Sequence, residues 1–180
     1  MLDPILTAVA RARAADMANR RYFSHVDPDG YGPNHLIRSA GYVLPEFWGG
    51  GRSANFVESI GAGYATPSAA WEGWMRSSPH RTHLLASKAF YRKQTNFGVG
   101  FHFDPQSPYR FYWVVITAPP AVGEIVRRGK TPVRIAVEIP AWTNRRETER
   151  PSAKKRTAFF PGVPRPTATR IPVSAPPVNP

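Results

Sequence analysis

The sequence predicts an α+β domain in which helices cover a small antiparallel sheet. Helix signals come first along the chain, in the order helix, short helix, helix, short helix, and a hairpin of two strands follows them. We find no strand–helix–strand repeat and no glycine-rich phosphate loop, which argues against a parallel, doubly wound sheet. The 180 residues are 42% hydrophobic and 12% aromatic, and this content is sufficient for one packed core.

The first predicted helix covers residues 3–21. Asp3 can cap its N-terminus, and Pro4 suits the first helical position. Apolar side chains recur at three- and four-residue spacing and form one stripe: Leu2, Ile5, Leu6, Val9, Ala10, Ala14 and Met17. Most of the charged residues fall off this stripe: Arg11, Arg13, Asp16 and Arg20. The pattern therefore predicts an amphipathic helix.

A loop over residues 22–32 follows this helix. Its run Asp27-Pro28-Asp29-Gly30 is typical of a tight turn. A second, short helix is predicted over 33–40, with Gly41 as its C-terminal cap. The segment 44–55 is rich in glycine, and we expect it to be irregular.

Two further helices are predicted in the middle of the chain. A Thr-Pro pair starts the helix over 66–76, and a Ser-Pro pair starts a shorter helix over 78–85. The second start places His80 in the first turn of its helix. Three large side chains at helical spacing in the earlier helix are interpreted as core: Trp71, Trp74 and Met75.

Residues 96–118 predict a β-hairpin with its turn at 104–108. In the first strand, large apolar residues alternate with small or polar ones: Phe97, Val99, Phe101 and Phe103 against Gly98, Gly100 and His102. The second strand is apolar on both faces. We therefore expect it to be the central, buried strand of the sheet.

The basic charge is concentrated at the C-terminal end of the chain. The formal net charge is +12, and residues 119–180 hold 12 Lys and Arg against 4 Asp and Glu. We predict a strand-like extension over 119–142 and a disordered, Pro- and Arg-rich tail over 143–180. Such a tail could attract an anionic surface, such as nucleic acid, acidic lipid or wall polymer, or could simply be solvated.

The composition also limits the chemistry and the cellular context. The chain has no cysteine, so strong metal ligands are limited to His, Asp and Glu. No stretch reaches the roughly 18 apolar residues that a transmembrane helix needs. The start of the chain lacks the basic and apolar regions of a signal peptide. We therefore expect a protein that stays inside the cell, or one whose true N-terminus lies upstream.

Three residues stand out as candidates for a shared site. His25 follows the first helix, Glu58 precedes the third, and His80 begins the fourth, so all three lie at the ends of predicted elements. Two imidazoles and a carboxylate can bind a divalent metal with an open position, or the carboxylate can orient a histidine that acts as acid or base. His83 shares a helical face with His80, so a His-x-x-His metal pair is an alternative. A surface location of His83 is the simpler expectation.

A series of motifs in residues 3–117 resembles the bacterial members of the CAP/SCP superfamily. That superfamily comprises the cysteine-rich secretory proteins, antigen 5 and the pathogenesis-related 1 proteins. The matching segments occur in the family's order: Ala15-Asp16-Met17-Ala18, Tyr22-Phe23-Ser24-His25, Gly41-Tyr42, Glu58-Ser59-Ile60, Trp74-Met75, His80-Arg81, Phe97-Gly98-Val99-Gly100 and Tyr112-Trp113-Val114. The family's first helix, upstream of residue 3, has no counterpart here.

The resemblance implies an α-β-α sandwich with a large central cavity. It also implies a tetrad of two histidines and two glutamates, which in several members binds zinc or another divalent metal. Three tetrad positions correspond to His25, Glu58 and His80. The second glutamate position corresponds to Arg76 or Ser77, neither of which is acidic, and Glu72 is a nearby substitute.

These observations lead to three functional hypotheses. The first is an extracellular or cell-envelope binding domain whose His/Glu cleft holds a metal and a small apolar or cell-wall glycan ligand. The second is a metal-dependent hydrolase, in which His25 and His80 hold the metal and Glu58 acts as base. The third is binding of a surface polymer or nucleic acid through residues 143–180, without sequence-specific recognition of nucleic acid.

Overall fold

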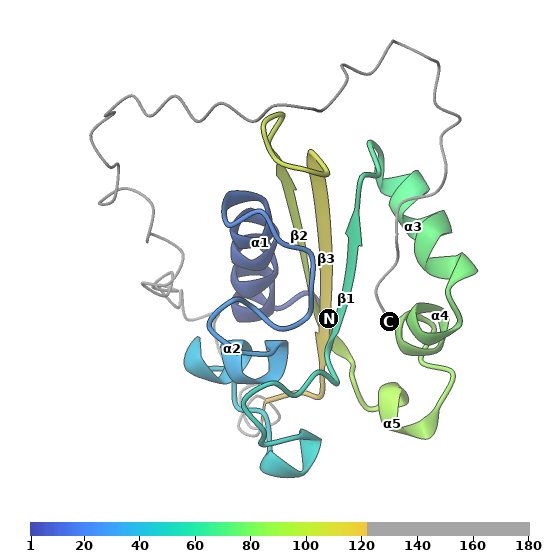
Figure 1. Ribbon diagram of the computed structural model, residues 1–180. Coiled ribbons are helices and arrows are strands. Elements are labelled where there is room, and N and C mark those ends of the chain that lie inside the picture. The colour runs from blue at the N-terminus through green and yellow to red at the C-terminus, as the bar shows by residue number, and fades with distance from the viewer. Residues whose placement is uncertain (122–180) are drawn as a thin grey trace, which may run out of the picture.

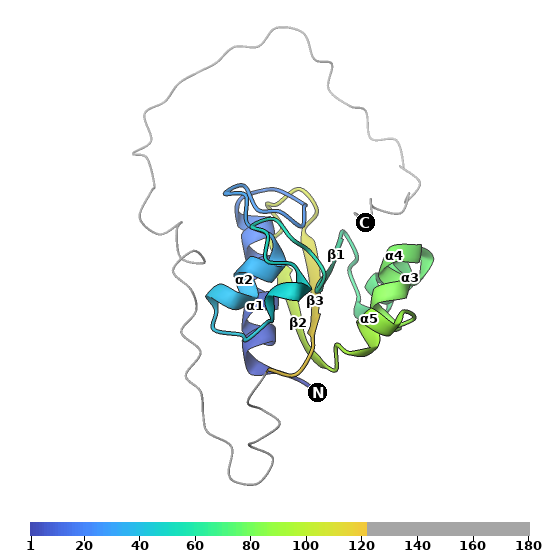
Figure 2. The ribbon, with the colours of Figure 1, turned by 90° about the horizontal axis from the view of Figure 1, so that it is seen from below.

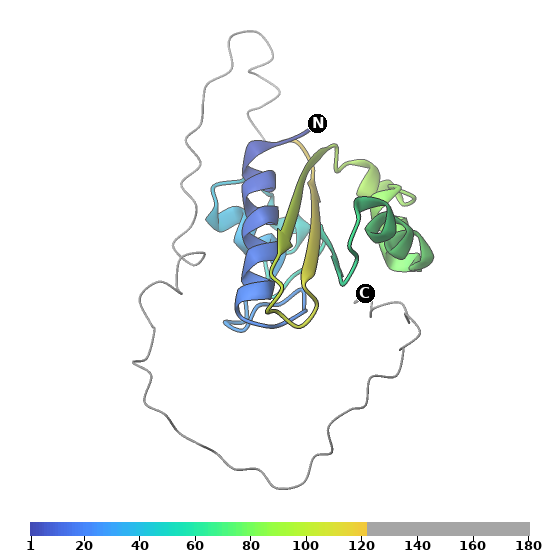
Figure 3. The same cartoon turned by 90° about the horizontal axis from the view of Figure 1, so that it is seen from above.

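The computed structural model describes residues 1–121, and these residues form three layers around an antiparallel sheet. Within this range the sheet has strands β1 (Glu58–Ala62), β2 (Asn96–Phe103) and β3 (Phe111–Ala118), in the order β1-β3-β2. One layer holds α1 (Pro4–Asn19) and α2 (Pro33–Ser39), and the other holds α3 (Pro67–Arg76), α4 (Ser78–Leu84) and α5 (Ala89–Arg92). Figure 1 shows the sheet between the two layers, and the views from below and above in Figures 2 and 3 agree. The predicted α+β class and α-β-α sandwich are confirmed.

The helices begin where the sequence provides caps. The Asp3 side chain accepts a hydrogen bond from the Leu6 amide, and the Thr66 side chain accepts one from the Ala69 amide. Proline occupies the first turn of α1, α2, α3 and α4, where the missing N–H has no intrahelical partner. Gly41 has a φ of +88°, which is the left-handed conformation expected just after a helix.

The hairpin forms as predicted, with β3 in the centre of the sheet. β2 and β3 pair in register from Asn96↔Ala118 to Phe103↔Phe111, and β1 pairs with the other edge of β3. Gly98 and Gly100 allow α1 to approach β2 very closely. A Cβ atom at Gly100 would lie 2.1 Å from backbone atoms of Ala10, and one at Gly98 would lie 2.2 Å from those of Leu6 and Thr7.

The opposite face of β2 is open. Four large apolar side chains on this face are 40–49% exposed: Phe97, Val99, Phe101 and Phe103. The main core therefore lies between the sheet and the α1–α2 layer. A smaller core of Tyr64, Ala70, Trp74 and Trp113 lies under α3 on the other face.

Several expectations from the sequence are wrong. Strand β1 was not predicted, because Glu58-Ser59-Ile60-Gly61-Ala62 shows no alternation; all five residues are buried. The 3-10 helix Glu46–Trp48 and helix α5 were also not predicted. Trp71, expected in the core, is 45% exposed, whereas Trp74 is buried as expected. Most of the predicted strand-like extension over 119–142 and the whole of the predicted tail over 143–180 lie outside the described residues.

Candidate functional site

A buried ion pair lies at the centre of the candidate site. Glu58 begins β1, and Arg13 of α1 reaches its carboxylate, with Nε 3.0 Å from Oε2 and Nη2 3.4 Å from Oε1. Both side chains are fully shielded from solvent. The Arg13 guanidinium also donates hydrogen bonds to the backbone carbonyls of Ser24 and His25, at 2.9 and 3.1 Å. Arg13 thus joins α1, β1 and the loop that carries His25.

Glu58 in turn orients the imidazole of His25. The Nδ1 atom of His25 lies 3.1 Å from Oε1 of Glu58. Burial alone would raise the pKa of Glu58, but Arg13 and His25 outweigh burial and lower this pKa below its usual range. An ionised carboxylate only accepts hydrogen bonds, so Nδ1 carries the proton. In neutral His25 the lone pair is therefore on Nε2.

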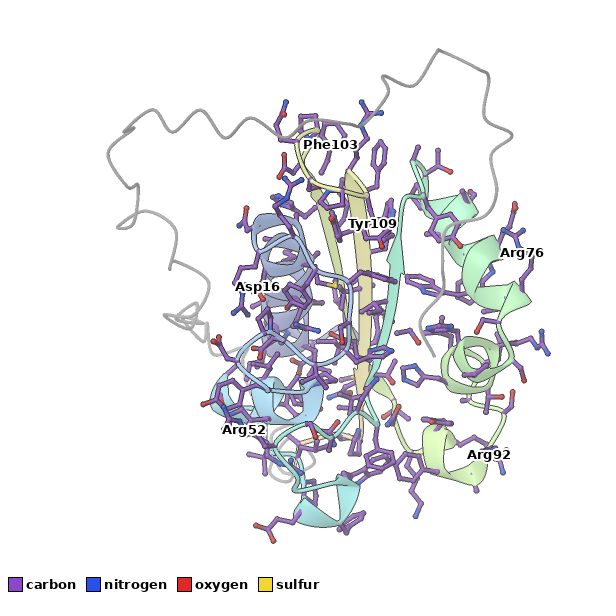
Figure 4. All side chains as sticks on the ribbon, viewed as in Figure 1. Asp16, Arg52, Arg76, Arg92, Phe103 and Tyr109 are labelled. Atoms are coloured by element: carbon purple, nitrogen blue, oxygen red, sulfur yellow. The ribbon has the colours of Figure 1, made fainter. Side chains whose placement is uncertain are left out.

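The loop that carries His25 is also held by charged groups. Arg20 pairs with Asp16 at 2.7 Å and with Asp29 at 2.8 Å, and the Tyr22 hydroxyl donates to Asp16 at 2.6 Å. Burial raises the pKa of Tyr22, so its hydroxyl remains a neutral donor. Asp16 lies on α1 beside this loop in Figure 4. The predicted turn over 27–30 is confirmed, since the Asp27 side chain accepts from the amides of Asp29 and Tyr31.

His80 lies on the opposite side of the same cleft. It occupies the first turn of α4, is 3% exposed, and its Nδ1 atom is 2.8 Å from Oγ of Ser77. The cleft has a volume of about 220 Å³. Its walls are His25, Asn55, Phe56, Glu58, Ser59, Pro79, His80, His83 and Tyr91. The structure thus brings His25, Glu58 and His80 together around one cleft.

His83 is buried, and the expectation of a surface histidine is wrong. It is 7% exposed, with Nδ1 2.7 Å from Oγ of Ser59 and Nε2 2.5 Å from Oγ1 of Thr117. Thr117 donates to Oε1 of Gln94, whose Nε2 donates to the Phe56 carbonyl at 2.6 Å.

This chain of hydrogen bonds has one direction. A carbonyl only accepts, so Gln94 presents its oxygen to Thr117, and Thr117 accepts from Nε2–H of His83. The Nδ1 atom of His83 therefore accepts the hydroxyl proton of Ser59. Burial, together with neighbouring His80 and His25, lowers the pKa of His83 to about 4, so its imidazole is neutral at pH 7.

Glu72 does not join the cleft. Its side chain is 66% exposed and lies 3.8 Å from the Arg76 guanidinium, one helical turn away on α3. Among residues 1–121, no group of three or more His, Asp or Glu side chains is arranged to hold a metal ion. The histidines that line the cleft are His25, His80 and His83.

Arg13 is the site residue that the sequence analysis missed. The sequence pattern groups it with charges that mostly fall off the apolar stripe of the first helix, but it is fully buried. Position 13 is four residues after Val9 and four before Met17, both on the buried face of α1. That spacing could have indicated burial, but the partner carboxylate, 45 residues away, could not be identified from it.

A second, apolar hollow lies between α3, α4 and the open face of the sheet. It has a volume of about 480 Å³. We call it the apolar groove, and it is lined by Pro67, Ala70, Trp71, Trp74, Leu84, Gln94, Phe97, Val99, Trp113, Val115 and Thr117. Indole N–H groups fix two of its walls, since Trp74 donates to the Ile60 carbonyl at 2.8 Å and Trp113 donates to the Tyr64 carbonyl at 2.7 Å.

Comparison with known proteins identifies the family. The model of the CAP (cysteine-rich secretory protein) family matches residues 1–117, and the chain belongs to this family. A protein of Bacillus subtilis (strain 168), described as "Uncharacterized protein YkwD", is 30% identical over 100 residues. The match covers 56% of this chain and 34% of that protein, so the chain spans about a third of the length of this relative.

Among solved structures, an outer surface protein from Borrelia burgdorferi is similar, with a TM-score of 0.47 and 18% identity. That match covers 66% of this chain and 75% of the other. No helix among the described residues is both long and apolar enough to cross a membrane.

Proposed function

We propose that this CAP-family chain is a binding domain of the cell exterior or cell envelope. Its cleft between the His25 loop, β1 and α4 would hold a divalent metal, with zinc as the first candidate, together with a small ligand. The observation that carries this proposal is the buried Arg13–Glu58 pair. That pair fixes the His25 ring so that the lone pair of Nε2 can coordinate a ligand.

The chemistry of the donor set fits zinc. A histidine ligand to zinc commonly donates its other ring N–H to a carboxylate, which sets the tautomer and raises the basicity of the ligating nitrogen. Glu58 has this relation to His25. His80 would supply the second imidazole, and water or the bound molecule would complete the coordination, as in zinc sites with open positions. When bound, the ion would supply a Lewis acid.

Binding has more support than hydrolysis. The hydrolase hypothesis assigns the role of base to Glu58, but this carboxylate is fully buried, is paired with Arg13, and has a lowered pKa. A carboxylate with a lowered pKa is a weak base near neutral pH. The same contacts suit a group that holds His25 in place.

The two hollows suggest two kinds of ligand chemistry. The cleft has walls of imidazole, hydroxyl and amide groups, which suit the hydroxyl groups of a cell-wall glycan. The apolar groove has walls of Trp, Phe, Val and Leu, which suit a small apolar molecule. Both ligand classes remain within the proposal.

Calorimetric titration with zinc chloride tests the metal part of the proposal. We expect the metal-free chain and the control variant His35→Ala to bind one equivalent, because His35 stacks on Tyr31 and is not among the cleft residues. We expect His25→Ala and His80→Ala each to weaken binding at least tenfold. Equal affinity of all four proteins would contradict the proposal.

Nuclear magnetic resonance titration tests the ligand part. Sterols, fatty acids and cell-wall fragments would each be added to the isotope-labelled chain. We expect at least one class to cause saturable shifts at cleft or groove residues. If no class does so, the chain is not a binding domain of this kind.

A further inference from the structure

The net positive charge of the described residues comes from one layer of the molecule. Residues 1–121 carry 12 Lys and Arg against 8 Asp and Glu. The segment 63–95, which contains α3, α4 and α5, has five cations and one acid, whereas the remainder has seven of each. The five cations are Arg76, Arg81, Lys88, Arg92 and Lys93. We call this set the basic layer.

All five cations of the basic layer are exposed to solvent. In Figure 4, Arg76 and Arg92 lie on the outer side of the α3–α5 layer, away from the sheet. The single acid of the segment, Glu72, pairs with Arg76 at 3.8 Å and offsets one charge. Outside the segment, two arginines pair with carboxylates: Arg13 with Glu58, and Arg20 with Asp16 and Asp29. Segment 63–95 therefore has a net charge of +4, five cations against one acid, whereas the cations and acids of the remaining described residues balance.

We infer that the basic layer docks a flexible anionic polymer through the polymer's phosphate or carboxylate groups. A surface with one sign of charge attracts a polyanion over distances of about 10 Å and raises its local concentration. Release of the counterions condensed on the polymer adds affinity, which then falls steeply with salt concentration. Arginine matches phosphate and carboxylate in a planar, bidentate geometry, and the layer has three arginines.

The side chains of this layer suit a polymer in water better than a bilayer or a nucleic acid. Among the large apolar residues of segment 63–95, Trp71 and Leu85 are exposed, and Trp71 lines the groove toward the sheet. Insertion into a bilayer surface would need more exposed apolar side chains on the same face. Stacking on bases would need exposed aromatic rings, but Phe90 and Tyr91 pack against each other and against Trp48 and His83.

Docking on the basic layer would bring the polymer next to the candidate cleft. Helices α4 and α5 carry Arg81 and Arg92, Lys88 immediately precedes α5, and the same two helices provide the cleft residues His80, His83 and Tyr91. The surface is nevertheless separate from the donor atoms of the cleft. Polymer binding should therefore be independent of metal binding at His25.

The test compares two variants of the full chain that lose the same charge. The layer variant is Arg81→Gln, Lys88→Gln, Arg92→Gln and Lys93→Gln combined. The control variant combines Arg11→Gln, Arg21→Gln, Arg52→Gln and Arg110→Gln, all at exposed positions outside the segment. Affinity is measured against long-chain polyphosphate and against polygalacturonate, which separate phosphate from carboxylate recognition, at several salt concentrations.

We expect the layer variant to weaken binding of at least one polymer about tenfold or more. The slope of log K against the logarithm of the salt concentration should decrease in magnitude by roughly 3 to 4. The control variant should change affinity less than threefold. Because Arg81 and Arg92 also donate to backbone carbonyls, thermal melting verifies folding. The double variant Lys88→Gln, Lys93→Gln should still weaken binding about three- to fivefold.

Equal losses in the layer and control variants would overturn the inference, because net charge alone would then explain binding. An unaffected layer variant would overturn it as well, because binding would then lie outside the basic layer. Tighter binding to phosphatidylglycerol vesicles or to a single-stranded oligonucleotide than to either polymer would also overturn it. His25→Ala should leave the affinity for polyphosphate unchanged, because this polymer has no sugar hydroxyl groups for the cleft, and this separates the test from that of the proposed function.

Discussion

The polar cleft and the apolar groove meet at one chain of hydrogen-bonded side chains, yet their walls are held in opposite ways. His83 lines the cleft, while its partners Thr117 and Gln94 line the groove. The cleft depends on buried charges and directed hydrogen bonds, which fix its imidazole rings. The groove depends on large apolar surfaces, several of which remain exposed. Polar walls therefore define donor atoms, whereas apolar walls define only a shape.

The largest expected effect is a loss of stability when the buried ion pair beside the cleft is broken. Arg13→Met removes the guanidinium and leaves the Glu58 carboxylate buried without its main partner, which costs about 3–5 kcal/mol of the free energy of unfolding. Urea unfolding measures this loss. Arg76→Met is the matched control, because the Arg76–Glu72 pair is well exposed and is worth less than about 0.5 kcal/mol. A loss below about 1 kcal/mol for Arg13→Met would mean that the pair does not hold the cleft together.

The second prediction concerns His83, which lies between the two hollows. Its pKa is about 4 in the folded chain against 6.5 for the free side chain, so the unfolded chain binds more protons between these values. Stability should therefore be complete above about pH 6.5 and fall by about 3 kcal/mol as the pH decreases toward 4. Glu58, whose pKa is lowered, adds a further loss at the acid end of this range.

The variant His83→Gln isolates this contribution. Between pH 4 and 6.5, its free energy of unfolding should depend less on pH than that of the natural chain. At mid-range the two slopes should differ by the amount that corresponds to uptake of about one proton on unfolding. His35→Gln serves as the control and should retain the natural pH dependence. Parallel pH profiles for His83→Gln and the natural chain would contradict a neutral, buried His83.

A smaller effect is expected on the groove side. Trp74→Phe removes the indole N–H and leaves the Ile60 carbonyl without this donor, which costs about 1–2 kcal/mol. Trp71 lines the same groove but is 45% exposed, so Trp71→Phe should change stability by less than about 0.5 kcal/mol. The melting temperatures of the two variants compare the buried, hydrogen-bonded Trp74 with the exposed Trp71. Equal shifts would show that exposure does not distinguish these tryptophans.

The smallest stability effect is expected at the rim of the groove. Phe97→Ser should cost no more than about 1 kcal/mol, since this side chain is 40% exposed and its backbone hydrogen bonds persist. It should nevertheless reduce the fluorescence of bound 8-anilinonaphthalene-1-sulfonate, a dye that reports exposed apolar surface. Phe103→Ser is the control, because Phe103 is exposed but does not line the groove. The same dye response in both variants would argue against binding in the groove.

The sequence by itself determined the elements whose signals are local. Caps and prolines indicated the starts of α1, α3 and α4, and alternation indicated the hairpin, because helical and strand periodicities act over a few residues. The series of short motifs also indicated the CAP family, which the family model confirms over residues 1–117. The structure brings its three candidates His25, Glu58 and His80 to one cleft.

Only the tertiary structure decided which polar residues are buried and which apolar residues are exposed. The sequence pattern groups Arg13 with charges off the apolar stripe and favours a surface location for His83. Both are buried, because Glu58, Ser59 and Thr117 form hydrogen bonds with them from distant parts of the chain. Strand β1 forms although its own residues show no strand pattern, because β3 supplies its hydrogen-bonding partner and helices cover it. The physical reason is that burial of a polar group depends on a partner, and a local pattern contains no information about a partner 45 residues away.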